Sequence, residues 1–123
     1  MHIRGIRGAT TVEEDSERAI LDATRDLLQQ MTQSNNVESD EIAAILFTST
    51  PDLTAAFPAE AARRLQWATV PLMSATEIAV PGAPPMCIRV LMLWNTPRAQ
   101  EEIDHVYLRR AVALRPDLRS RRT

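Results

Sequence analysis

Residues 86–94 have the sequence Met86-Cys87-Ile88-Arg89-Val90-Leu91-Met92-Leu93-Trp94, an apolar run that contains a single charged residue. Its length, its continuity and the flanking prolines predict a β-strand that is covered on both faces. Arg89 is anomalous there, because a guanidinium stays charged and its unpaired burial costs several kcal/mol. The side chain must therefore reach solvent, meet a protein carboxylate or bind an anionic ligand, and the strand alone leaves all three open.

The composition is that of an ordinary soluble globular protein, with 123 residues, 45% hydrophobic content and a net charge of −2. This length predicts a single domain, placed at 1–118 and followed by a flexible tail at 119–123. The small net charge indicates no general binding to nucleic acid or to anionic membranes. No apolar run approaches the roughly 20 residues that span a bilayer, and the N-terminus has no signal-peptide pattern, so a cytoplasmic protein is expected.

The basic and sulfur-containing residues exclude several kinds of chemistry. All 14 basic residues are arginine, which excludes a lysine Schiff base and a P-loop lysine. Cys87 is the only cysteine, so the chain forms no internal disulfide. Cys87 and the two histidines do not have the spacing of metal ligands, and we expect no metal site.

The apolar pattern predicts strands at 3–12, 42–50, 69–74 and 86–94, with helices at 16–35 and 58–65. Asp15 or Ser16 is expected to cap the first helix. A strand, a long helix and a strand form a βαβ-like unit, so the first two strands should share a sheet. The segment 109–114 fits either a helix or a strand.

Several charged residues are candidates for a binding site. Arg4 and Arg7 differ by three positions and point to opposite faces of a regular strand, so at most one of them faces a site unless a bulge at Gly5 intervenes. Arg63 lies near a helix C-terminus, where a cation also suits the helix dipole. Glu77 lies among small and apolar residues, either as a surface carboxylate or as part of a site.

A series of segments occurs in a recognisable order. They are Ile3-Arg4-Gly5-Ile6-Arg7-Gly8-Ala9-Thr10-Thr11-Val12, Thr50-Pro51-Asp52-Leu53, Phe57-Pro58-Ala59, Cys87-Ile88-Arg89-Val90, His105-Val106-Tyr107-Leu108 and Leu114-Arg115-Pro116-Asp117-Leu118. Together they resemble the monofunctional, sheet-containing class of chorismate mutase over essentially the whole chain. The resemblance implies an α+β fold with a mixed β-sheet packed with helices. It also implies a homotrimer of the pseudo-α/β-barrel type, with an active site at each subunit interface.

The resemblance further implies a reaction, the 3,3-sigmatropic rearrangement of chorismate to prephenate in phenylalanine and tyrosine biosynthesis, without a cofactor or a metal. The substrate has two carboxylates and must be held in a compact conformer. The breaking C–O bond places negative charge on the ether oxygen, where fixed donors lower the barrier. Arginine side chains can meet both demands.

By the same resemblance, Arg89, Glu77 and Arg7 are the catalytic residues. Arg89 would face the ether oxygen, Arg7 would hold a carboxylate with Tyr107, and Glu77 would accept a hydrogen bond from the ring hydroxyl. The other implied substrate contacts are Phe57, Ala59, Arg63 from the neighbouring subunit, Met73, Ser74, Leu114 and Arg115. Two positions depart from several relatives, which have a cysteine at Ser74 and a lysine at Glu60.

Two alternatives use similar residues: a non-catalytic trimeric module that binds small anions, and an imine deaminase of similar subunit architecture. The opening motif and the Tyr107 segment argue against the deaminase. Glu77 argues against a simple anion binder, because a carboxylate repels an anionic ligand.

Overall fold

The computed structural model describes residues 1–114. In chain order the elements are β1 (His2–Thr11), α1 (Glu17–Asn35), η1 (Ser39–Glu41), β2 (Ile42–Ser49), α2 (Glu60–Arg64), β3 (Leu72–Thr76), β4 (Cys87–Thr96), η2 (Gln100–Glu102), β5 (Val106–Tyr107) and η3 (Arg109–Ala113), where η is a 3-10 helix. Arg115 and the predicted tail at 119–123 lie outside the described residues.

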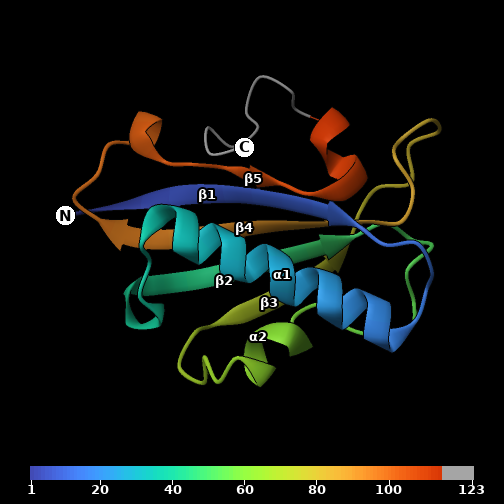
Figure 1. Cartoon of the computed structure of the whole chain (residues 1–123), viewed down its shortest axis with the longest axis horizontal. Helices are drawn as coiled ribbons and strands as arrows, with labels where there is room; N and C mark the ends of the chain where they lie inside the picture. The colour runs from blue at the N-terminus through green and yellow to red at the C-terminus, as the bar shows by residue number, and fades with distance from the viewer. Residues whose placement is uncertain (115–123) are drawn as a thin grey trace.

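The strands form one mixed sheet in the order β3-β2-β4-β1-β5. β4 is antiparallel to both of its neighbours, β1 and β2, whereas β3 and β5 run parallel to the strands that they join. β1 and β2 are therefore parallel members of one sheet, as the βαβ-like pattern predicts. Figure 1 shows α1 lying across one face of the sheet with α2 beside β3. The predicted α+β class with a mixed sheet is confirmed.

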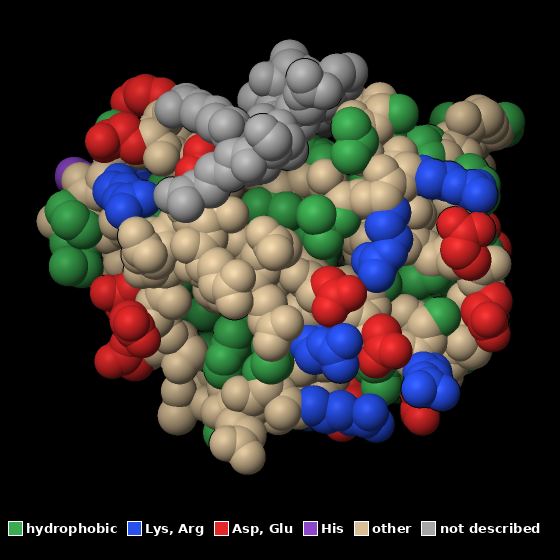
Figure 2. All heavy atoms as spheres, viewed as in Figure 1, with side chains coloured by type: hydrophobic (Ala, Val, Ile, Leu, Met, Phe, Trp, Pro, Cys, Tyr) green, Lys and Arg blue, Asp and Glu red, His purple; other side chains and the backbone are tan. Residues whose placement is uncertain are grey.

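The core lies between α1 and the sheet. Ser16 caps the helix, since its Oγ accepts a hydrogen bond from the Ala19 N–H at 3.1 Å. The buried stripe of α1 packs against inward-facing residues of the strands; this cluster includes Leu27, Leu28, Met31, Ile6, Ile45, Phe47 and Met92. On the outer side of α1, the N-terminal half of the helix carries interspersed arginine and acidic side chains (Figure 2).

Within residues 1–114, the other face of the sheet is open along β2 and β4. Along β4, Ile88, Val90 and Met92 are buried, whereas Arg89 and Leu91 are exposed. Within residues 1–114, the expected cover on both faces is therefore not present along β4, because α1 packs on the opposite face and η3 packs only against Ala9 and Tyr107 at the β1–β5 side of the sheet. The local sequence does not predict this exposed face, since Leu91 and Leu93 are as apolar as the buried residues of the strand.

Three other elements differ from the sequence prediction. α2 is shorter than 58–65 and begins at Glu60, after turns at Pro58 and Ala59. β3 begins at Leu72, because its ladder with β2 starts at the Ile45–Leu72 pair. The ambiguous segment 109–114 forms the 3-10 helix η3 over Arg109–Ala113. None of the helices within residues 1–114 combines the length and the apolar character needed to cross a bilayer.

Asp15 fastens the loop that leads to Phe57. Its carboxylate accepts hydrogen bonds from the backbone N–H groups of Thr54 and Ala55, each at 3.0 Å, and from the Thr54 hydroxyl at 2.9 Å. Desolvation tends to raise the pKa of Asp15, but these hydrogen bonds to the charged form outweigh it and hold the pKa below the ordinary 3.8. The loop is thus tied to the turn between β1 and α1.

Gly8 allows α1 to approach β1 closely. A Cβ at this position would overlap Met31 Sδ and would lie 3.1 Å from Leu27 Cδ1, and both side chains are fully buried. We predict that Gly8→Ala lowers the free energy of unfolding by about 1–3 kcal/mol, because the core is overpacked. Chemical denaturation measures this, with Gly5→Ala as the control, since its methyl meets only the partly exposed Leu91, at 3.3 Å. Equal losses in the two variants would contradict the prediction.

The lowered pKa of Asp15 gives a pH dependence with a defined sign. A carboxylate whose pKa is depressed on folding stabilises the protein above the unfolded pKa, and this contribution is lost as the pH falls through the folded pKa. Asp15→Asn should lower Tm at neutral pH, and the difference from wild type should shrink as the pH falls below 3.8. Thermal melts across this range test it. Glu14→Gln is the control, since Glu14 is an exposed carboxylate without a hydrogen bond to residues 1–114, and a matching effect there would refute the specific role of Asp15.

Candidate active site

The register of the sheet gathers the predicted arginines on its open face. Residues that pair directly across neighbouring strands project to the same face. One such row consists of Met73, Leu46, Leu91 and Arg7, and the next consists of Ala75, Thr48, Arg89, Ala9 and Tyr107. Arg7 and Arg89 are therefore diagonal neighbours, with a typical Cα separation of about 7–8 Å. Arg4 instead donates from Nε to the Arg98 carbonyl at 2.9 Å, so only one of the two β1 arginines faces this site.

A cavity of about 420 Å³ opens on these rows. Its lining residues are Arg7, Gly8, Ala9, Leu46, Thr48, Arg89, Val90, Leu91 and Tyr107. Two guanidinium groups at the rim of an apolar floor can hold a small molecule that carries carboxylates, since arginine binds a carboxylate through paired N–H donors. The cavity thus combines predicted site residues from three strands.

Glu77 completes this group from the segment after β3. Its Oε2 lies 3.3 Å from Arg89 Nε and accepts a hydrogen bond from Thr48 Oγ1 at 2.6 Å. The side chain of Arg89 is 44% exposed and that of Glu77 is 17% exposed, so the pair is partly shielded from water. Arg89, which the sequence identified as unusual, therefore pairs with a protein carboxylate and also lines an open cavity.

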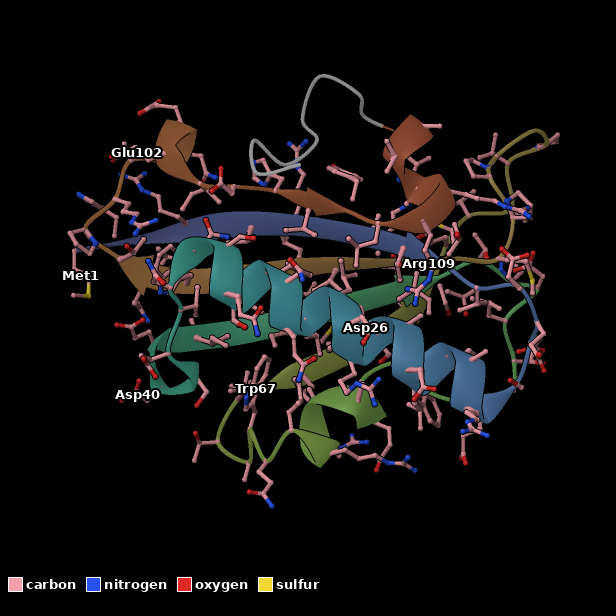
Figure 3. The ribbon with its side chains drawn as sticks, viewed as in Figure 1. Met1, Asp26, Asp40, Trp67, Glu102 and Arg109 are labelled. Atoms are coloured by element: carbon pink, nitrogen blue, oxygen red, sulfur yellow. The ribbon has the colours of Figure 1, made fainter. Side chains whose placement is uncertain are left out.

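The chain after Tyr107 is tied back to β1 and α1. Arg109, which has a φ of 54°, donates to Thr10 Oγ1 at 3.0 Å and pairs with Asp26 of α1 at 3.2 Å. Figure 3 shows Arg109 and Asp26 side by side. These contacts hold η3 against the sheet, where Leu114 packs on the buried cluster that includes Tyr107. Leu114 therefore packs against the cluster that contains Tyr107, and it is not among the residues that line the arginine cavity.

Cys87, two residues before Arg89, is fully buried. Burial raises the pKa of its thiol above the ordinary 9.0, and the charge of Arg89 opposes this rise only in part. The group is a neutral thiol at physiological pH and a poor nucleophile. Among residues 1–114, no three His, Cys, Asp or Glu side chains come close enough together to hold a metal ion.

A second cavity, of about 560 Å³, lies beside the Asp15-bound loop and the end of β3. Two predicted site residues, Phe57 and Ser74, line it, and Phe57 is 72% exposed. Arg63 is exposed on α2, where its Nη1 pairs with Glu60 Oε1 at 3.0 Å. Met73 is also exposed, whereas Ala59 is buried in the core beneath α2. The predicted site residues thus divide into two groups on one chain.

Thr48 is a polar residue of this cavity that sequence reasoning missed. It lines the arginine cavity and hydrogen-bonds Glu77, yet it lies in a strand predicted only as core. The available signal was the change from apolar residues to Thr48-Ser49-Thr50 at the end of that strand, beside the Pro51-Asp52 turn.

Comparison with known proteins identifies a family. The model of the family "Chorismate mutase type I" matches residues 3–118. Chorismate mutase AroH from Thermus thermophilus is 59% identical over 119 residues, which are 96% of this chain and 98% of that protein. The Bacillus subtilis (strain 168) enzyme AroH is 47% identical over 96% of this chain and 94% of its own length.

A solved structure supports the same assignment. A chorismate mutase from Clostridium thermocellum superposes with a TM-score of 0.88 at 47% identity, and the match covers 89% of this chain and 97% of the other. The arginine cavity, the mixed sheet and these full-length matches lead to one conclusion: the chain belongs to the type I chorismate mutase family.

Proposed function

We propose that this protein is a cytoplasmic homotrimer in which each active site joins the arginine cavity of one copy to the Phe57 and Arg63 surface of the next. The main support for this proposal is that the predicted site residues lie in two separate groups on one chain. Arg7, Glu77, Arg89 and Tyr107 lie together, whereas Phe57 and Arg63 lie elsewhere on the same chain. A second copy that covers the open cavity would supply the missing groups.

The exposed apolar residues favour such an assembly. Leu46, Leu91 and Met73 form a row on the open face of the sheet, and Met73 is 66% exposed. Ile78 and Val80 are also exposed in the segment that follows Glu77. Contiguous apolar surface on a soluble protein is typical of an interface. When different surfaces of identical copies meet around a threefold axis, the ring closes with three equivalent clefts.

The reaction of the family is the conversion of chorismate to prephenate, a 3,3-sigmatropic rearrangement that serves aromatic amino-acid biosynthesis. The ether C–O bond breaks while a C–C bond forms in the same molecule. No proton or electron passes between protein and substrate, so the isomerase needs shape and fixed charge in place of a nucleophile or a general acid. The buried neutral Cys87 is consistent with this demand.

Arg89 is the group that stabilises the transition state in this proposal. Negative charge grows on the ether oxygen as the C–O bond breaks, and a cation fixed there lowers the barrier without reorganisation. The antiparallel ladders of β4 with β1 and β2 hold the backbone of Arg89 on both sides. Glu77 orients the guanidinium through Nε.

The other residues hold the substrate in its reactive conformer. Arg7 and Tyr107 would bind the side-chain carboxylate, and Glu77 would accept from the ring hydroxyl. From the second copy, Phe57 would pack on the ring and Arg63 would approach the ring carboxylate. The remaining contacts are proposed for Ala59, Met73, Ser74, Leu114 and Arg115.

Glu60 bears on this capture step. It pairs with Arg63 and, at 3.7 Å, with Arg64, so it partly neutralises the arginine that is proposed to meet the ring carboxylate.

The family assignment argues against an imine deaminase. The Glu77–Arg89 pair argues against a simple anion-binding module, because the carboxylate would oppose anion capture.

Mixing two inactive variants tests the shared site. Arg63→Ala and Arg89→Ala each remove one arginine, and refolding them together in equal amounts should restore activity. Random reassembly leaves about one quarter of the clefts with both arginines. Native mass spectrometry confirms the mixed trimers, and the loss of chorismate absorbance measures turnover. Mixed trimers without activity would contradict the shared cleft.

A reciprocal mixture serves as the control. Wild-type protein refolded with equal Arg63→Ala/Arg89→Ala double variant should also retain about one quarter of intact clefts if the site is shared. If each site lay within one copy, about one half would remain intact. The two mixtures therefore separate a shared site from a site within one chain.

A further inference from the structure

We infer that Thr48 is a positioning residue that keeps the Glu77 carboxylate from closing on Arg89 and leaves one of its oxygens for the substrate. The inference rests on the proposed roles of Glu77 and Arg89. Its direct basis is that Oε2 of Glu77 takes both contacts, accepting from Thr48 Oγ1 at 2.6 Å and facing Arg89 Nε at 3.3 Å.

The sheet fixes Thr48 between the two charged partners. On one side Thr48 pairs with Arg89 of β4, and on the other it pairs with Ala75 of β3. Glu77 follows Ala75 by two residues, and its backbone N–H donates to the Ser49 carbonyl at 2.9 Å. A β-branched threonine has a restricted χ1, so its hydroxyl is held in one place. Thr48 is thus a rigid donor aimed at a carboxylate near an edge strand.

The shared oxygen has a consequence for Glu77. No hydrogen bond from residues 1–114 reaches Oε1, while Oε2 is held by the 2.6 Å contact. Oε1 is therefore the oxygen that can accept from a substrate hydroxyl. Thr48 therefore determines which oxygen of Glu77 accepts the hydrogen bond from the substrate hydroxyl, although Thr48 does not itself need to contact the substrate.

The same bond has a consequence for Arg89. Arginine and carboxylate groups favour a bidentate pair, in which both oxygens bind the guanidinium and neutralise it. The contact observed between the two groups joins Glu77 Oε2 to Arg89 Nε, at 3.3 Å. A carboxylate released from Thr48 could rotate into the bidentate geometry and draw the guanidinium away from the ether oxygen. The hydroxyl of Thr48 keeps the cation available for the transition state.

Two substitutions at Thr48 isolate the hydroxyl. Thr48→Val keeps the shape and the β-branch but removes the donor, whereas Thr48→Ser keeps the donor. We expect Thr48→Val to lower kcat by about tenfold to a hundredfold, the usual effect of losing a hydrogen bond to a charged group. KM and Tm should change little. Thr48→Ser should recover most of kcat, a rescue that a purely structural role of the β-branch would not give.

A double-mutant cycle with Glu77→Gln tests whether Thr48 acts through Glu77. Residues that work as a unit are non-additive, so Thr48→Val should reduce kcat by less than about twofold when Glu77→Gln is already present. If the double variant instead loses kcat by the product of the two single-variant factors, the inference is overturned. It is also overturned if Thr48→Val has wild-type kcat while Glu77→Gln has a lowered kcat. An unimpaired Glu77→Gln enzyme would instead overturn the proposed role of Glu77, and the inference with it.

Discussion

Arg89 is a permanent cation in the middle strand of the sheet, and its charge constrains the surrounding structure. A guanidinium cannot be neutralised by losing its proton, and its isolation in a dry core costs several kcal/mol. Within residues 1–114, the chain meets this constraint by covering only one face of β4 and by placing Glu77 3.3 Å from Nε. The same open face leaves Leu46 and Leu91 partly hydrated. In the proposed trimer, a second copy covers these leucines and encloses the cation in the substrate site.

Because the reaction of the family takes place within one substrate molecule, its active site needs no nucleophile or general acid. Fixed charges lower the barrier only if they do not move when the substrate's charge shifts, so in the proposed mechanism the rigidity of the sheet contributes to catalysis. The ladders on both sides of β4 provide it for Arg89, and α1 supports β1 behind Arg7 through the Gly8 contact. Asp15 and the Arg109–Asp26 pair do the same for the loop before Phe57 and for the segment after Tyr107.

The sequence predicted features that depend on local pattern. The apolar stripe and the N-cap residue predicted α1. The position of Arg89 inside an apolar run identified it as unusual. Features that depend on register or on distant contacts were not predictable. Thr48 becomes a site residue only because β2 pairs with β4, and η3 forms where Arg109 and Arg110 bond to Thr10 and Thr11. The open face of β4 depends on which elements cover the sheet, which its own residues do not encode.

The central claim is that the charge of Arg89, rather than its shape, provides the catalysis, and Arg89→citrulline tests this most directly. Citrulline keeps the length and planarity of the side chain but is neutral. Single-turnover kinetics should show kcat lowered by at least 10²–10³-fold, the order expected for losing one fixed donor to the developing charge. Substrate affinity should change modestly, and Tm should change little, because citrulline fits the same space and the side chain of Arg89 is 44% exposed. A kcat within roughly tenfold of wild type, about 1.4 kcal/mol in the barrier, would contradict the claim.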